Sequence, residues 1–302
     1  MPRTSRTTVW LFLAPALAFY LAFVVAPILQ SFVVSLFDWP TNAVPPTRFV
    51  GLDNYTRLVA DGVFWKALAH NVILLVLSLV IQLPLALVLA TFLSGRVFAR
   101  GFFRTVYFAP MILPSVVIAL VWEQMYMPAA TDGLFVKVLG SLGLPFPKDG
   151  FLGDPRFALG ALILAISWRY VGFHMVLFMA GIEMIPEDLY EAARIDGAGP
   201  WQLFRYITLP SLAPVVRISA VLSIVGSLKY FDLVYIMTRG GPPEHATELM
   251  TTYMYQIGID RYDGGYGSAV AVGGFLVSVL VVALVMGMRW HLRAAAPAEV
   301  RP

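Results

Sequence analysis

Long apolar runs, separated by short polar segments, follow one another along the chain. A helix needs roughly 20 apolar residues to cross the hydrocarbon core of a bilayer. Six segments reach that length, and they cover residues 10–37, 68–93, 106–127, 157–183, 211–238 and 266–290. The alternation of apolar and polar residues that marks barrel strands is absent. The pattern therefore predicts an all-α integral membrane protein with six transmembrane helices.

The composition supports this prediction and excludes several classes of site. Of the 302 residues, 59% are hydrophobic and only 13% are charged, whereas soluble domains average about 25% charged residues. The chain has no cysteine, which excludes disulfides, thiolate metal sites and thiol nucleophiles. The net charge of +3 is too small and too dispersed for a nucleic-acid surface.

Lysine and arginine indicate the orientation of the helices. The tight triplet Arg96, Arg100 and Arg104 lies between the second and third segments, which places that loop in the cytoplasm. The N-terminus and the C-terminus then also lie inside. The first apolar run is longer than the core of a cleaved signal, about 7–15 residues, so we interpret it as an uncleaved span. The predicted organisation is a cytoplasmic N-terminus (1–9), a six-helix transmembrane domain (10–290) and a cytoplasmic tail (291–302).

The loop between the fourth and fifth segments carries a pattern of its own, "IPEDLYEAARIDGAGPWQLFRYITLP". Pro186 suits the first helical position, and the helix dipole favours Glu187 and Asp188 in the first turn. Gly197 can adopt the left-handed conformation that ends a helix, and Pro200 can begin a second helix. Residues 186–210 are therefore predicted to form two short helices joined by a turn.

The charge of this loop indicates what it contacts. Surface helices that rest on lipid favour Lys and Arg on their polar face, whereas this loop is mainly acidic. It holds Glu183, Glu187, Asp188, Glu191 and Asp196 against Arg194 and Arg205. An acidic face fits an anionic cytoplasmic leaflet poorly, so the sequence predicts a protein partner.

The same loop resembles the EAA loop of ABC-importer permeases. Its defining positions are Glu191, Ala192, Ala193, Gly197, Ile207, Leu209 and Pro210, at the spacing of that motif. The stretches "FVGLDNYTRLVADGVFWKALAHNVILL", "AGIEMIPEDLYEAARIDGAG" and "FDLVYIMTRGGPP" resemble the carbohydrate branch, of maltose and glycerol-phosphate type. The resemblance covers about residues 10–290.

The resemblance implies a type I ABC importer permease fold in a bacterial inner membrane, with the EAA loop docked on a cytoplasmic ATPase. It implies a second EAA-loop permease as a heterodimer partner, two copies of the ATPase and an extracytoplasmic sugar-binding protein. The sequence has no GxxxxGK[ST] motif, so this chain is expected to hold no cofactor, and ATP with magnesium would bind to the partner ATPase.

A solute path for sugar requires hydroxyl groups and flat apolar faces near the middle of the bilayer. Ser219, Ser223, Ser227 and Tyr230 recur on one face of the fifth segment, although small residues at this spacing also let helices pack closely. The predicted path comprises Tyr170, Phe173, Ser223, Ser227, Tyr230, Phe231 and Asp232.

Several other residues in the predicted spans favour structural roles. Arg169, Glu123, Lys229 and Asp232 are expected to form ion pairs rather than sugar contacts. Trp168 fits a packing role as well as a sugar platform. His174 is predicted to be an interior histidine, since no second ligand at metal spacing accompanies it.

Two other functions would require features of their own. A self-powered secondary transporter is expected to show two related halves with broken helices, and no internal repeat is visible. An intramembrane enzyme needs a nucleophile or a metal motif, and neither HExxH nor a GxSxG-like serine is present. The sequence therefore favours a transport subunit that is not an enzyme.

Overall fold

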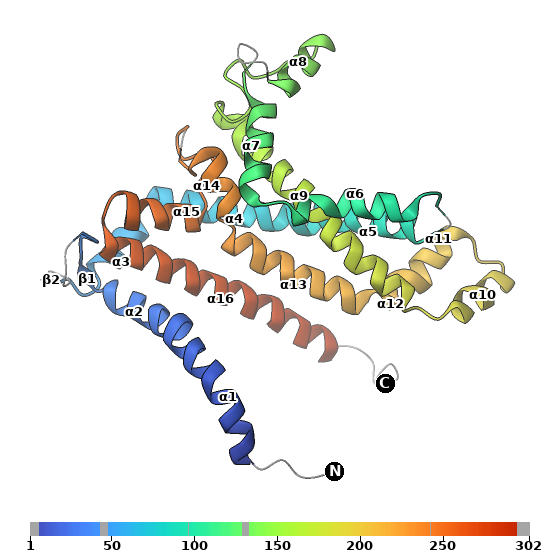
Figure 1. Ribbon diagram of the computed structural model, residues 1–302, viewed down its shortest axis with the longest axis horizontal. Helices are drawn as coiled ribbons and strands as arrows, with labels where there is room; N and C mark the ends of the chain where they lie inside the picture. Colours follow the sequence, from blue (N-terminus) through green and yellow to red (C-terminus); the bar gives the residue numbers. More distant parts are fainter. Residues whose placement is uncertain (1–5, 43–47, 96, 129–132, 242, 295–302) are drawn as a thin grey trace. The chain divides into compact units, whose positions relative to one another are not determined.

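The computed structural model describes residues 6–42, 48–95, 97–128, 133–241 and 243–294, most of which are helical (Figure 1). The chain divides into two compact units, residues 1–64 with 253–302, and residues 65–252. Most of the predicted tails at 1–9 and 291–302, together with Arg96, lies outside the described residues.

The first unit combines an N-terminal and a C-terminal segment of the chain. Its elements are α1 (Arg6–Tyr20), the π turn η1 (Leu21–Val25), α2 (Ala26–Val34), β1 (Phe37–Asp38), β2 (Arg48–Phe49), α3 (Asp53–Ala60), the π turn η5 (Gln256–Asp260) and α16 (Gly264–Ala294). The strands pair antiparallel, with Phe37 opposite Phe49. Helix α16 packs against α2 and α3. A Cβ on Gly265 would lie 2.1 Å from the carbonyl oxygen of Phe37, so only glycine allows α16 to approach β1 this closely.

The second unit holds the central helices. Its elements include η2 (Ser78–Gln82), α5 (Leu83–Ser94), α6 (Arg100–Ile112), α7 (Ser115–Tyr126), α8 (Leu134–Ser141), α9 (Pro155–Glu183), α10 (Glu187–Ile195), α11 (Pro200–Leu203), η4 (Phe204–Thr208), α12 (Leu209–Ser211), α13 (Ala213–Lys229) and α14 (Asp232–Thr238). Helices α4 (Gly62–Leu77) and α15 (Met250–Tyr255) run across the boundary between the units.

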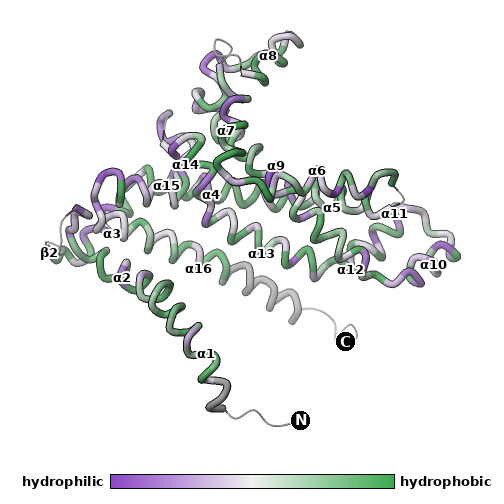
Figure 2. Tube along the Cα trace, viewed as in Figure 1, coloured by the Kyte–Doolittle hydropathy of each residue, from purple (hydrophilic) through white to green (hydrophobic). Residues whose placement is uncertain are grey.

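Helix α9 packs against α5, α6 and α13, and most of its inward face is buried. A Cβ on Gly172 would lie 1.8 Å from the carbonyl oxygen of Tyr107. Helix α6 therefore crosses α9 in backbone contact at this glycine. Hydrophobic residues predominate along α1 and α2, whereas hydrophilic residues predominate on α10 (Figure 2).

Among the described residues, four continuous helices are long and apolar enough to span a membrane, and two bent helix pairs bring the possible number to six. The third predicted span is not one helix: α6 and α7 meet at an angle of 99°. Leu113 and Pro114 are both extended there, with ψ near 140°. A residue before proline disfavours the helical conformation, which explains the break. Pro114 was its signal in the sequence, whereas Pro110 lies inside α6.

The fifth predicted span, 211–238, is also wrong as a single helix. Helix α13 ends at Lys229, because Tyr230 is extended with ψ of 128°, and α14 begins separately at Asp232. At its other end, α13 follows the segment Pro200–Ser211 after a bend of 65°. The fourth span, α9, agrees with the predicted 157–183.

Three of the four described π turns precede a proline. The residue directly before the proline donates its N–H five residues back, as Ala26 does to Leu21, Leu83 to Ser78 and Leu209 to Phe204. Proline has no N–H and its ring clashes with the carbonyl four residues earlier. A wider turn relieves that clash without ending the helix.

Candidate functional site

The predicted helix–turn–helix at residues 186–210, which we call the elbow, is present in the second unit. Helix α10 forms its first arm, and α11 with η4 forms its second arm. Pro186 lies one position before the helix, because it is extended with φ of −56° and ψ of 133°. The prediction that it occupies the first helical position is therefore wrong by one residue. Glu187 and Asp188 do occupy the first turn.

Gly197 forms the turn of the elbow, with φ of +83°. The N–H of Ala198 donates to the carbonyl of Ala193 at 2.9 Å, and the N–H of Gly197 donates to that of Arg194 at 3.0 Å. These two bonds make up a Schellman motif. The predicted left-handed helix end is confirmed.

A side-chain hydrogen bond joins the two arms. The hydroxyl groups of Tyr190 on α10 and Thr208 at the end of η4 lie 2.9 Å apart. Thr208 is buried. Its hydroxyl group also lies 3.4 Å from the carbonyl oxygen of Leu203. The hydrogen bond between Tyr190 and Thr208 therefore fixes the angle between the two arms.

The outer surface of the elbow is exposed and partly apolar. No residue of α10 is buried, and Ile195 and Trp201 are 87% and 70% exposed. A hollow of about 200 Å³ lies between the arms. It is lined by Ala193, Asp196, Gly197, Ala198, Gln202, Leu203, Tyr206 and Ile207. Three of the seven EAA positions therefore share one hollow, while Glu191 and Ala192 are exposed on α10.

The base of the elbow is held by tight contacts. A Cβ on Gly181 would lie 2.7 Å from Leu212 and 2.9 Å from Val215, so α9 and α13 meet closely where the elbow begins and ends. Arg100 at the start of α6 forms an ion pair with Glu183 at the end of α9. Helices α6, α9 and α13 therefore converge at this point.

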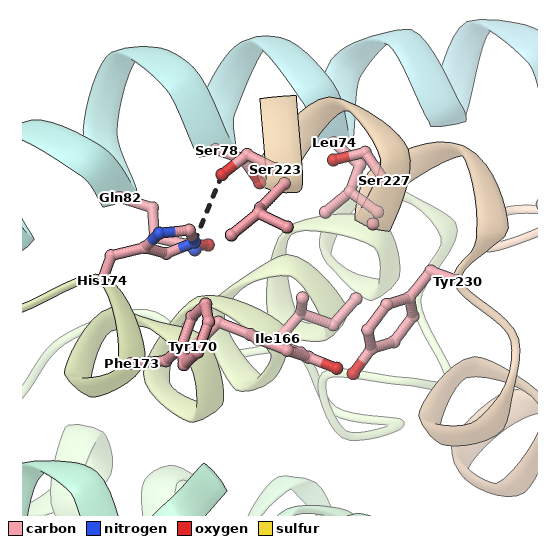
Figure 3. Close-up of a pocket in the computed structure, with 12 residues that line it drawn as sticks. Leu74, Ser78, Gln82, Ile166, Tyr170, Phe173, His174, Ser223, Ser227 and Tyr230 are labelled. Atoms are coloured by element: carbon pink, nitrogen blue, oxygen red, sulfur yellow. Dashed lines mark hydrogen bonds between the residues drawn. The ribbon is translucent and has the colours of Figure 1, made fainter. Parts of the chain in front are cut away.

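A cavity of about 190 Å³ lies between the second, fourth and fifth spans (Figure 3). It is lined by Leu74, Ser78, Gln82, Ile166, Tyr170, Phe173, His174, Leu222, Ser223, Gly226, Ser227 and Tyr230. Five residues of the predicted path are brought together here: Tyr170, Phe173, Ser223, Ser227 and Tyr230. Leu222 and Gly226 are exposed, so the cavity is open on that side.

Phe231 and Asp232 of the predicted path do not line this cavity. The chain turns away after Lys229, so the helical spacing assumed for them does not apply. The ring of Phe231 stacks on Tyr235 at 5.1 Å. A carboxylate oxygen of Asp232 accepts a hydrogen bond from Ser115 at 3.2 Å.

Sequence reasoning missed the contribution of the second span. Leu74, Ser78 and Gln82 line the cavity from α4 and η2, and His174 lines it although it was assigned to the interior alone. The available signal was the pair Ser78 and Gln82, two polar residues one turn apart just before Pro84.

Two polar atoms of residues that line this cavity lack partners. Within the described part of the chain, Oε1 of Gln82 and Nδ1 of His174 are buried and form no hydrogen bond, whereas the hydroxyl of Tyr230 interacts with Arg169 and Tyr170. Buried polar groups are hydrogen-bonded in the great majority of cases. Their convergence on one cavity indicates that a polar occupant completes the site.

The walls around these atoms are fixed. The other nitrogen of His174, Nε2, lies 3.3 Å from the hydroxyl of Ser223 (Figure 3). Asn71 is fully buried on α4, donates to the carbonyl of Ser227 at 2.6 Å and accepts from the N–H of Met250 at 2.9 Å. Asn71 thereby holds α4 against α13 beside the cavity.

The ion pairs expected among the charges of the spans are absent from the described residues. Arg169 donates to the carbonyl of Leu113 at 3.4 Å, at the break of the third span, and its Nε has no partner. Lys229 and Asp232 belong to different helices, so their spacing of three does not place them on one face. Trp168 packs edge-on against Trp122 at 5.6 Å, which fits the packing role.

Comparison with protein families finds one match. The family described as "binding-protein-dependent transport system inner membrane component" matches residues 82–295. That range includes the elbow and most of the cavity.

Curated relatives match almost end to end. The lactose transport system permease protein LacF of Rhizobium radiobacter is 34% identical over 96% of this chain and 98% of its own length. The trehalose/maltose transport system permease protein MalF of Thermococcus litoralis is 34% identical over 92% of each chain.

A solved structure shares the fold. The crystal structure of a bacterial alginate ABC transporter, in complex with an alginate pentasaccharide-bound periplasmic protein, superposes with a TM-score of 0.80. It is 22% identical and covers 94% of both chains.

Proposed function

We propose, from the premise that this chain belongs to the family of binding-protein-dependent transport system inner membrane components, that its elbow couples a solute path to a partner ATPase. The chain is a multi-pass protein of the inner membrane and the permease subunit of a sugar ABC importer, as its relatives for lactose and for trehalose and maltose are. It is a transport subunit and not an enzyme.

The elbow is the part of the chain suited to dock on another protein. Of its seven EAA positions, Glu191 and Ala192 lie on an exposed acidic helix, and Ala193, Gly197 and Ile207 lie around a hollow. Small residues at the hollow allow a close backbone approach by a partner. Exposed apolar side chains such as Ile195 and Trp201 would be covered by that partner.

Movement of the elbow would pass directly into the spans. The Tyr190–Thr208 bond keeps the two arms together, and Gly181 packs against Leu212 and Val215 at the base. When the partner ATPase closes on ATP, the elbow would carry α9 and α13 with it as rigid bodies. The solute path between these helices would then open to the opposite side.

The cavity of Figure 3 supports a role in the solute path. Its serine, glutamine, histidine and tyrosine side chains supply the hydrogen-bonding groups that a sugar requires. The rings of Tyr170 and Phe173 supply flat apolar faces. Phe231 and Asp232 remain candidates outside the cavity.

The energy source and the partners belong to the same proposal. ATP with magnesium would bind to two copies of a cytoplasmic ATPase and not to this chain. A second EAA-loop permease would complete the path as a heterodimer with this chain. An extracytoplasmic binding protein would deliver the sugar.

The observation that carries this proposal is the left-handed Gly197 at the turn of the elbow. An alanine there costs about 1–2 kcal/mol of backbone strain. A Cβ at Gly197 would meet nothing within 4 Å, so Gly197→Ala changes the shape of the turn without a clash. Gly160→Ala is a matched control, because Gly160 lies inside α9 and also faces open space.

The test uses the complete importer in proteoliposomes. Gly197→Ala is expected to lower both the retention of the ATPase on the purified membrane complex and the uptake of sugar. If the whole strain energy is lost from docking, each falls by about five- to thirtyfold. Gly160→Ala is expected to leave both unchanged. If the double variant Gly197→Ala with Glu191→Ala retains the ATPase and takes up sugar at the parent levels, the elbow does not couple the ATPase to the solute path.

A further inference from the structure

We propose that Gln82 and His174 form a recognition pair that binds the hydroxyl groups of an uncharged sugar ring and discriminates against anionic sugars. This inference rests on the proposed function, because it assigns the substrate class of the same solute path. It adds a residue of the second span, Gln82, to a path that the sequence placed on the fourth and fifth spans alone.

The π turn η2 places two polar side chains in the cavity. Ser78 and Gln82 stand at its two ends, and both are buried, at 5% and 3% exposure. Their neighbour Val80 is 64% exposed on the outer side. The wider turn before Pro84 thus directs two polar side chains into the cavity. A polar side chain directed into an apolar span costs free energy unless it finds a partner.

Two groups that remain unpaired match a sugar hydroxyl. Gln82 offers an acceptor through Oε1. His174 can offer either role at Nδ1, because Nε2 can accept from Ser223 in one tautomer and donate to it in the other. A sugar hydroxyl both donates and accepts, so it matches each of these groups.

The lining also carries little charge. Among the twelve described residues that line the cavity, none is Asp, Glu, Lys or Arg, and Arg169, which interacts with Tyr230, is not part of the lining. A carboxylate or phosphate buried here would lose its hydration without a charged lining side chain to pair with, which is unfavourable. A neutral ring carries no such cost, and its flat face can rest on Tyr170 or Phe173.

Water alone could also fill the cavity, since 190 Å³ far exceeds the 10–15 Å³ that one water needs on a comparable measure. The test must therefore detect sugar at Gln82 itself. The chain has no cysteine, so a single introduced thiol can be followed without background.

The first measurement is protection of Gln82→Cys from N-ethylmaleimide in the complete reconstituted importer. We expect protection by whichever of maltose, lactose and trehalose the importer transports, and none by an anionic alginate disaccharide. Leu142→Cys serves as the control, because Leu142 lies at the end of α8, does not line the cavity and is 66% exposed. Its labelling is expected to be the same with and without sugar.

The second measurement is transport kinetics. Gln82→Leu keeps the size of the side chain but removes its polar atoms, and we expect the KM for the neutral sugar to rise about three- to tenfold, the equivalent of one neutral hydrogen bond. The elution profile of the purified complex in size-exclusion chromatography separates recognition from folding. The KM should rise less in His174→Gln than in His174→Leu. Val80→Leu, on the exposed side of the same π turn, is the matched control.

Each result decides between the proposals. If the parent transports a neutral sugar but Gln82→Cys is not protected and Gln82→Leu keeps the parent KM, the cavity holds water and the recognition pair is wrong. Equal protection by the alginate disaccharide would overturn the discrimination by charge. If the parent transports none of the neutral sugars, then this inference fails together with the sugar specificity of the proposed function.

Discussion

Asp61 shows how one side chain can organise a part of the fold. One carboxylate oxygen accepts from the backbone N–H groups of Val63 and Phe64, at 2.8 and 3.4 Å, and so caps α4. The other accepts from the hydroxyl groups of Tyr253 and Tyr266. Residues that lie 192 and 205 positions after Asp61 in the sequence therefore meet at its carboxylate.

The stability of this arrangement depends on pH. Burial alone would raise the pKa of Asp61, but the four hydrogen bonds outweigh burial and hold that pKa below its ordinary value. The stabilisation is then fully present above about pH 4, the usual pKa of an unfolded aspartate, and is lost as the pH falls through the lower folded value.

We predict that Asp61→Asn lowers the free energy of unfolding by about 1–2 kcal/mol at pH 7, because hydrogen bonds to a charged acceptor are stronger than those to an amide. The difference from the parent should shrink below about pH 4. Thermal unfolding of the purified protein across this pH range measures it. Asp53→Asn, at an exposed position on α3, is the control, and a difference that is constant with pH would contradict the prediction.

Some single residues could be assigned from the sequence, and others could not. Gly197 could be assigned to a left-handed turn because a helix end is determined by its neighbours. Arg169 could not be assigned a partner, because the carbonyl of Leu113 becomes available only where another span breaks. Partners in space do not follow from spacing along one helix.

At the scale of elements, the elbow is joined to the third span as well as to the fourth and fifth. The Arg100–Glu183 ion pair links the first residue of α6 to the last residue of α9. Their side chains are 37% and 54% exposed, so the pair contributes at most about 1 kcal/mol to stability. Its position at the base of the elbow indicates a role in alignment.

We predict that Arg100→Glu or Glu183→Arg alone lowers sugar uptake per ATP hydrolysed, because like charges push α6 away from the end of α9. The free energy of unfolding should change by no more than about 1 kcal/mol. The double exchange should restore most of the coupling. Uptake and ATP hydrolysis in proteoliposomes measure the ratio.

Arg104→Glu is the control for this exchange, because Arg104 lies on the same helix and forms no ion pair in the described part of the chain. If the double exchange recovers no more uptake per ATP than either single variant, this ion pair does not align the helices.

For the whole molecule, the orientation in the membrane stays a prediction from charge. With the N-terminus inside, Phe98 faces the cytoplasm and Leu142 faces outward, and both are well exposed, at 94% and 66%. We predict that a membrane-impermeant maleimide labels Leu142→Cys in right-side-out vesicles, whereas Phe98→Cys reacts only after permeabilisation. The parent chain is a blank because it has no cysteine. The reverse pattern would place the elbow on the wrong side for an ATPase.

The sequence by itself determined the features that depend on neighbours along the chain. The length of the apolar runs located the membrane segments, because crossing a bilayer requires a minimum length. Proline, glycine and the acidic first turn located the elbow, because helix ends are satisfied locally. The EAA spacing indicated the family.

Only the tertiary structure decided what lies together across helices. It broke the third span at Leu113 and the fifth at Tyr230, and so removed Phe231 and Asp232 from the face they were expected to share with Ser227. It also brought Gln82 to the same cavity as His174. The physical reason is that each side chain in a span has several faces available, and only packing against the other helices selects one of them.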